Sequence, residues 1–107
     1  MTFSLTGRCA RTGMFGVIVT SSSPAVAARC AWVRGNVGAV STQNITDPGL
    51  GIMGLDLMQQ GFGAKKAMEM IVGARAFSEY RQIALIDALG HTAHHSGAKT
   101  LGTNNVA

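Results

Sequence analysis

The segment QIALID, residues 82–87, is the feature that most constrains the fold of this chain. In an extended strand, Ile83 and Leu85 would lie on one face, and Ala84 and Ile86 on the other. A strand with two apolar faces is typical of a sheet that is covered on both sides. The fold therefore needs a layer on each side of this strand.

The rest of the chain divides into strand-like and helix-like segments. Further strands are expected at 2–7, 14–20, 37–43 and 91–96, and a short apolar segment lies around 30–33. Helical periodicity predicts helices at 50–60 and 63–74. The expected core positions are Ile52, Leu55 and Met58 in the first helix, and Ala64, Ala67, Met68, Ile71 and Val72 in the second.

The predicted order, β-β-β-α-α-β-β, is typical of an α+β fold with helices on one face of an antiparallel sheet. Two helices can cover only one face of the strand at 82–87. The other face needs a second sheet, for which the chain scarcely has the strands. We therefore expect an incomplete fold.

The first strand raises a separate question. Phe3 and Leu5 alternate with Thr2, Ser4 and Thr6, which predicts a half-buried strand leading into a core. A hydroxyl residue thus stands directly behind the initiator methionine, at the head of that strand.

Composition bounds the protein and its partners. The 107 residues amount to one domain or part of one, and 47% are hydrophobic while only 13% are charged. If this apolar content exceeds what one small core can bury, the excess must meet another chain or segment.

Several classes of function and site are excluded. The net charge is +4, but the nine basic residues are scattered, so no nucleic-acid partner is expected. Cys9 and Cys30 lack zinc spacing, and the histidines lack acidic or cysteine partners at ligand spacing, so neither a metal nor a cofactor is expected. The chain shows no signal peptide and no membrane span, which favours a cytoplasmic protein.

Three segments taken in order resemble a bacterial family. They are MTFSLTGRCARTGMFGVIVTSSS, GAVSTQ and EYRQIALIDALGHTAHHSGAK. They are similar to domain of unknown function 1028 (DUF1028), whose members carry a Met-Thr-Phe-Ser-type strand, a Gly-Ala-Val-x-Thr-Gln strand and a Tyr-Arg-Gln-hydrophobic strand. The resemblance covers essentially all 107 residues. The family belongs to the Ntn-hydrolase-like group.

The resemblance implies a four-layer αββα sandwich of two antiparallel sheets. Residues 1–107 would be its amino-terminal part, and 97–107 a tail at a truncation or cleavage point. The remainder would form a second chain, released from the same precursor by cleavage after Ala107. Paired chains of this kind would then assemble as a homo-oligomer.

Thr2 is the first candidate nucleophile. Removal of Met1 would leave a threonine whose hydroxyl and α-amine belong to one residue, and an α-amine titrates near about pH 8, so it can act as the general base. The opening also resembles proteasome-type subunits, which use such a threonine. The rival nucleophile is the residue that would follow Ala107.

Supporting residues fit that resemblance only in part. Proteasome-like sites place an aspartate and a lysine near the threonine, whereas this chain has serines, with Arg29 or Arg34 in place of the lysine. An arginine fixes positive charge but takes up no proton. The candidates for contacting substrate or oxyanion are Ser21, Ser22, Arg29, Arg34, Thr42 and Gln43, and those for a pocket acid or base are His94 and His95.

The expected function is an Ntn-type amidohydrolase that cleaves a small amide, lactam or related C–N bond. The alternative is a non-catalytic Ntn-like scaffold that binds a small metabolite or serves as an oligomeric partner.

Overall fold

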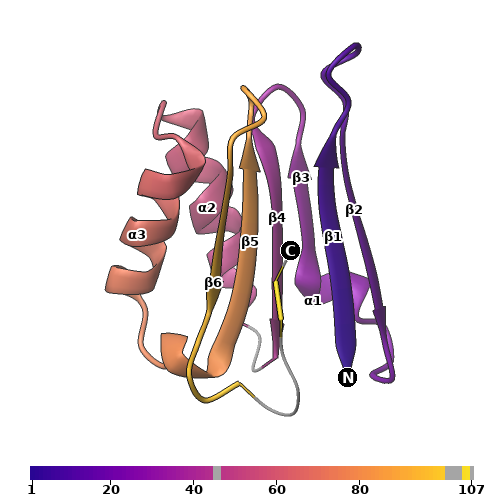
Figure 1. Ribbon diagram of the computed structural model, residues 1–107, viewed down its shortest axis with the longest axis vertical. Coiled ribbons are helices and arrows are strands. Elements are labelled where there is room, and N and C mark those ends of the chain that lie inside the picture. The colour runs from indigo at the N-terminus through magenta and orange to yellow at the C-terminus, as the bar shows by residue number, and fades with distance from the viewer. Residues whose placement is uncertain (45–46, 101–104, 107) are drawn as a thin grey trace.

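The strand predicted at 82–87 lies in the interior of a sheet. In the computed structural model, which describes residues 1–44, 47–100 and 105–106, it is β5, Arg81–Asp87. It pairs antiparallel with β4, Gly38–Asn44, on one side and β6, Thr92–Ser96, on the other (Figure 1). With β3, Ala31–Arg34, these strands form a four-stranded sheet of order β3-β4-β5-β6.

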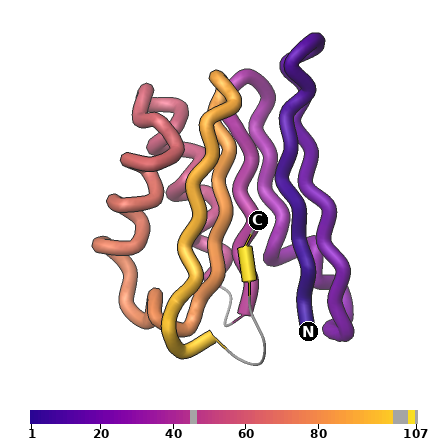
Figure 2. Tube along the Cα trace, viewed as in Figure 1, coloured from indigo at the N-terminus to yellow at the C-terminus, as the bar shows by residue number. Residues whose placement is uncertain are grey.

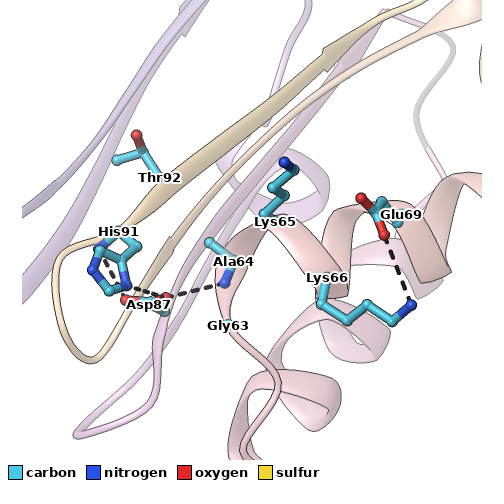
Figure 3. A pocket seen from close by; sticks show the side chains of 8 residues that line it. All are labelled: Gly63, Ala64, Lys65, Lys66, Glu69, Asp87, His91 and Thr92. Carbon is cyan, nitrogen blue, oxygen red and sulfur yellow. Dashed lines mark hydrogen bonds and ion pairs between the residues drawn. The ribbon is translucent and has the colours of Figure 1, made fainter.

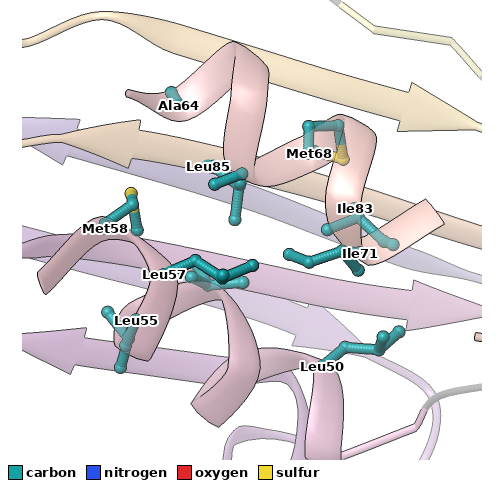
Figure 4. Close-up of a cluster of buried hydrophobic side chains, with 11 residues drawn as sticks. Leu50, Leu55, Leu57, Met58, Ala64, Met68, Ile71, Ile83 and Leu85 are labelled. Atoms are coloured by element: carbon teal, nitrogen blue, oxygen red, sulfur yellow. The ribbon is translucent and has the colours of Figure 1, made fainter. Parts of the chain in front are cut away.

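Two helices cover one face of this sheet. They are α2, Gly49–Gln59, and α3, Ala64–Ala74. Figure 4 shows their apolar side chains meeting Ile83 and Leu85 of β5. The buried cluster consists of Val40, Leu50, Leu55, Leu57, Met58, Ala64, Ala67, Met68, Ile71, Ile83 and Leu85.

The expected core face is confirmed for α3 and partly wrong for α2. Ile52 is 50% exposed, whereas Leu50 and Leu57 are buried. The reason is that Gly51 and Gly54 turn toward the sheet, where Gly51 lies against the indole of Trp32. Two residues without side chains let the helix approach closely, and this rotates Ile52 out to solvent.

The other face of the sheet is covered by a hairpin. Its strands are β1, Thr2–Arg8, and β2, Phe15–Ser21, paired so that Thr2 is opposite Ser21. β1 contacts β4 and β5, and β2 contacts β3 and β4 (Figure 1; Figure 2). The described chain is therefore built of three layers, helices, sheet and hairpin, and both faces of β5 are covered.

The first hairpin strand, β1, packs against the sheet with its polar face, which sequence alone did not predict, whereas the inward residues of β2 include Val17 and Val19. Phe3 and Leu5 are 64% and 63% exposed, whereas Thr2 and Ser4 are partly buried. The Ser4 hydroxyl donates to Ser41 Oγ of β4 at 3.2 Å. Because β4 presents hydrogen-bonding groups here, the polar face of β1 turns inward and the apolar face remains uncovered.

Three short elements differ from the predicted order. The apolar segment at 30–33 is a strand, β3, so four strands rather than three precede α2. The serine- and alanine-rich stretch before it contains a short helix, α1, Ala27–Cys30, and a 3₁₀ turn, η1, Ser78–Tyr80, precedes β5. Within the described ranges, no helix has the length and apolar character needed to cross a lipid bilayer.

Candidate functional site

Small polar side chains meet where the start of β1 faces the sheet. Thr2 and Ser21 end the two hairpin strands side by side, with their hydroxyl oxygens 2.9 Å apart. One residue pair further along the inner face, Ser4 bonds to Ser41 of β4. The strand period of two places Thr2 and Ser4 on one face of β1.

Two glutamine side chains extend this arrangement into the sheet. Gln43 Nε2 donates to the backbone carbonyl of Thr2 at 3.3 Å and to Gln82 Oε1. Gln82 Nε2 donates to the carbonyl of Asn105 at 3.1 Å. We call Thr2, Ser4, Ser21, Ser41, Gln43 and Gln82 the polar cluster.

The backbone next to the polar cluster holds the first residue. The amino group of Met1 donates to Ser22 Oγ at 3.3 Å, and the Ser22 amide donates to the Met1 carbonyl at 3.4 Å. The Ser23 amide donates to Ser21 Oγ at 3.1 Å. Met1 itself is 76% exposed, so the residue in front of Thr2 projects into solvent.

The two candidate arginines are engaged elsewhere. Arg34 forms an ion pair with Asp56 at 2.8 Å and also donates to Gln59, on the helix side of the sheet. It pairs with Gly38, five residues from Gln43 along β4, or about 17 Å of extended strand. Arg29 donates to the carbonyl of Pro24 at 3.0 Å. The Arg34 guanidinium therefore lies away from Thr2, and that of Arg29 is bonded to a backbone carbonyl.

Thr42 and the histidines divide between the two faces of the sheet. Thr42 donates to the Arg29 carbonyl at 3.4 Å, and its neighbour in the register, Ile83, belongs to the helix-side core. His95 also pairs with Ile83, and its Nε2 lies 2.9 Å from the Ser78 carbonyl.

His94 lies on the opposite face from His95. It is opposite Ala84, which is opposite Ser41, so it is on the hairpin side, on the strand next to that of Gln82 and two strands from Ser41. Its side chain is exposed. Among the described residues, no three His, Cys, Asp or Glu side chains gather as metal ligands.

A shallow depression of about 400 Å³ lies at the far end of β5 (Figure 3). Its floor is Asp87, which accepts hydrogen bonds from the amides of Ala64, Leu89 and His91 at 2.9–3.0 Å. Burial alone would raise the pKa of Asp87, but these amides outweigh burial and hold the pKa below its ordinary value. The carboxylate joins α3 to the β5–β6 turn, so we interpret it as structural.

Sequence reasoning missed Ser4, Ser41 and Gln82 as members of the polar cluster. A signal was present, because Ser4 follows Thr2 and Ser41 precedes Gln43 by one strand period, so each pair shares a face. No sequence pattern, however, indicated that these two faces would meet.

Comparisons with known proteins identify relatives of this architecture. The chain matches the model of a family described as "Family of unknown function (DUF1028)" over residues 2–107. A comparison with curated proteins gave no match.

A solved structure has the same fold. The chain is similar to the crystal structure of protein SPO2555 from Silicibacter pomeroyi, described by the same family model, with a TM-score of 0.88 and 24% identity. The match covers 92% of this chain and 46% of that one, so this chain spans about half of its relative's length. At this identity the likeness establishes the fold alone.

Proposed function

This chain belongs to the DUF1028 family, and on that premise we propose that it forms one part of an Ntn-type amidohydrolase. The substrate is a small amide, lactam or related compound whose C–N bond is cleaved by an N-terminal nucleophile. The observation that carries the proposal is the polar cluster, which surrounds Thr2 at the head of β1.

The place of Thr2 supports its role as the nucleophile. Its hydroxyl lies between the hairpin and the sheet, 2.9 Å from Ser21 Oγ, and its carbonyl is held by Gln43. Once Met1 is removed, the α-amine of Thr2 occupies the same residue as the attacking hydroxyl. An exposed Met1 is accessible to the enzyme that removes it.

The rival nucleophile, the residue after Ala107, is served by the same cluster. Ala107 lies outside the described residues, but Asn105 is described, and its carbonyl accepts a hydrogen bond from Gln82. Gln82 in turn contacts Gln43, which contacts Thr2. The glutamine pair thus contacts both Thr2 and Asn105, two residues before Ala107, and cleavage after Ala107 would yield the second chain.

The proposed reaction has two stages. The Thr2 hydroxyl gives its proton to the α-amine and attacks the substrate carbonyl, and the tetrahedral intermediate expels the substrate amine, which leaves with that proton. Water then hydrolyses the resulting ester, releases the acid and restores the hydroxyl. The same scheme applies to a Thr, Ser or Cys at the head of the second chain.

Removal of Met1 would also free donors for the oxyanion. The Ser22 amide donates to the Met1 carbonyl, and the Ser22 hydroxyl accepts from the Met1 amino group, so removal of Met1 frees the amide to donate and leaves the hydroxyl without that donor. They then stand next to the threonine as neutral donors. Donors directed at a developing oxyanion contribute about 3–4 kcal/mol each to lowering the barrier.

A second chain is the proposed partner, and the outer face of the hairpin supports it. Exposed apolar side chains lie along this outer hairpin face: Met1, Phe3, Leu5, Met14 and Ile18. An apolar sheet face of this kind marks an interaction site. In the αββα arrangement the second chain would cover this face, and the paired chains would assemble as a homo-oligomer.

A non-catalytic scaffold is the second candidate, and one observation favours it. The side chains that bond one another in the polar cluster are hydroxyls and amides, without a Lys, Asp or His among them. Such a site binds a small polar metabolite well. It can catalyse only if a free α-amine supplies the base.

Mass spectrometry of the natural protein distinguishes these candidates. A single chain beginning at Thr2 supports Thr2, whereas a second fragment beginning with Thr, Ser or Cys supports the rival nucleophile. Retention of Met1 without a second fragment would leave only the scaffold.

Activity measurements then test the nucleophile itself. A panel of small amides and lactams is assayed for amine release, and the acyl adduct is located by mass. If Thr2 is the nucleophile, Thr2→Ala lowers turnover at least about 1,000-fold. Thr6→Ala, on the same face of the same strand, is the matched control and retains turnover. An adduct on the second chain, with Thr2→Ala active, would exclude Thr2.

A further inference from the structure

The carbonyl oxygen of the Gln43 side chain is a buried acceptor for which the described part of the chain supplies no donor. Gln43 is only 9% exposed, and its Oε1 has no hydrogen-bond partner among the described residues. Buried side-chain oxygens are nearly always paired, because leaving one unpaired costs about 1–3 kcal/mol. A donor supplied from outside the described chain would recover that free energy.

The orientation of this amide follows from its neighbours. Gln43 Nε2 lies against two acceptors, the Thr2 carbonyl and Gln82 Oε1, and Gln82 is fixed in turn because its Nε2 donates to Asn105. Turning the Gln43 amide over would set its oxygen against both acceptors and lose both bonds. Its oxygen therefore faces away from them, and remains available.

The position of this acceptor ties it to the candidate nucleophile. Gln43 holds the backbone of Thr2 through its nitrogen, so the oxygen belongs to the same amide group that contacts the residue proposed to attack. β1 and β4 belong to different sheets and meet here through side-chain hydrogen bonds rather than through a strand ladder. Separating them locally would not break a strand ladder.

We propose that Gln43 Oε1 accepts a hydrogen bond from an N–H of the ligand, and so selects neutral amides with a free N–H. Primary amides, secondary amides and lactams meet this requirement, whereas tertiary amides, esters and carboxylates do not. A carboxylate is further disfavoured, because it would place its charge against an oxygen acceptor and because Arg34 is paired with Asp56. This inference deepens the proposed function. Its prediction about which amides are turned over rests on the proposed hydrolase, whereas its prediction about which amides bind does not.

The test compares two probes that differ only in the N–H. Acetamide and N,N-dimethylacetamide are titrated into the ¹⁵N-labelled natural protein, together with any chain that co-purifies with it, and the side-chain amide resonances of Gln43 are followed. We expect acetamide to shift these resonances at concentrations at least tenfold lower than the dimethyl compound. Equal responses, or no response to acetamide, would overturn the proposal.

A matched pair of variants assigns the effect to Gln43. Gln43→Met, which removes the acceptor, should abolish the preference for acetamide, measured by ligand-observed saturation transfer. Gln60→Met, an exposed position beyond α2, should preserve it. If Gln43→Met does not fold, the comparison of the two probes on the natural protein still tests whether the ligand N–H is required.

Failure of this inference is distinct from failure of the proposed function. Preferential binding of acetamide without turnover of any amide supports the acceptor and contradicts the hydrolase. Turnover of tertiary amides as fast as that of secondary amides supports the hydrolase and contradicts the acceptor.

Discussion

Two glycines set the position of α2 on the sheet, because neither has a side chain. A Cβ on Gly51 would collide with the indole ring of Trp32, and a Cβ on Gly54 would lie 3.2 Å from side-chain atoms of Ile71 and Val40. Glycine costs a helix about 1 kcal/mol relative to alanine. The close approach that it permits buries Leu50, Leu55 and Met58 instead.

Exchange of two helical glycines for alanine should have opposite effects. Gly51→Ala should lower the free energy of unfolding by about 1–3 kcal/mol, since the new methyl group overpacks against Trp32. Gly73→Ala in α3 meets no described atom within 4 Å and should raise it by up to about 1 kcal/mol. Urea denaturation measures both, and equal effects would contradict this packing.

At the scale of elements, one carboxylate joins three segments. Asp87 ends β5, caps the first amide of α3 and closes the turn that leads to β6 (Figure 3). Asp followed by a turn is a familiar local signal, but the bond to Ala64, 23 residues earlier, depends on tertiary structure.

The carboxylate of Asp87 should make the free energy of unfolding depend on pH in the acid range. Because the folded pKa of Asp87 lies below the ordinary aspartate value of 3.8, its contribution is complete above that pH and is lost as the pH falls through the folded pKa. Asp87→Asn should flatten the loss of stability below about pH 4, and should cost about 1–3 kcal/mol at pH 7. Thermal unfolding across the pH range measures both effects.

The matched control is another aspartate that forms an ion pair. Asp56 is bonded to Arg34, but its side chain is 54% exposed. Asp56→Asn should change stability by less than about 1 kcal/mol, because an exposed pair is screened by solvent. A larger effect for Asp56→Asn than for Asp87→Asn would show that Asp87 does not hold these elements together.

At the scale of the whole molecule, the two faces of the hairpin behave in opposite ways. The inner face, which carries Thr2 and Ser4 of β1 beside Val17 and Val19 of β2, lies against the sheet. The outer hairpin face exposes Phe3, Leu5 and Ile18. In a chain where 47% of residues are hydrophobic, such a face is a surface for association.

Disruption of the outer hairpin face should therefore separate the proposed assembly and leave the sheet intact. Ile18→Lys, at a position 68% exposed, should lower the mass measured by light scattering, because burial of an unpaired ammonium opposes association. Leu89→Lys, in the β5–β6 turn and 79% exposed, is the control and should retain the native mass. An unchanged mass for Ile18→Lys would argue against partner binding through this face.

Local patterns predicted most of the architecture. The long strands, the two main helices and the core face of α3 follow from periodicity, because periodicity reflects which side of each element is apolar. The face of α2 was predicted wrongly, since Gly51 and Gly54 carry no hydrophobic signal although they face the sheet. The β3 strand, four residues long, is too short to show a pattern.

The residues of the candidate site also fall into those that the sequence identified and those that only the tertiary structure revealed. Thr2, Ser21 and Gln43 were identified from the chemistry of their side chains and their places at strand ends. Gln82 and Ser41 were not, because their role depends on the hairpin lying over β4 and β5. Arg34 was misplaced, since its partner Asp56 is 22 residues away on a helix.

By itself, the sequence determined that β5 needs a cover on both faces, that two helices supply one cover, and that a hydroxyl stands at the head of β1. Only the tertiary structure decided which face of the hairpin supplies the other cover. Alternation specifies two faces but not which one turns inward, and here hydrogen bonds from Ser4 to Ser41 and from Gln43 to Thr2 turn the polar face of β1 toward the sheet. The threonine is thereby partly buried, and Phe3 and Leu5 of β1 are left open to a partner.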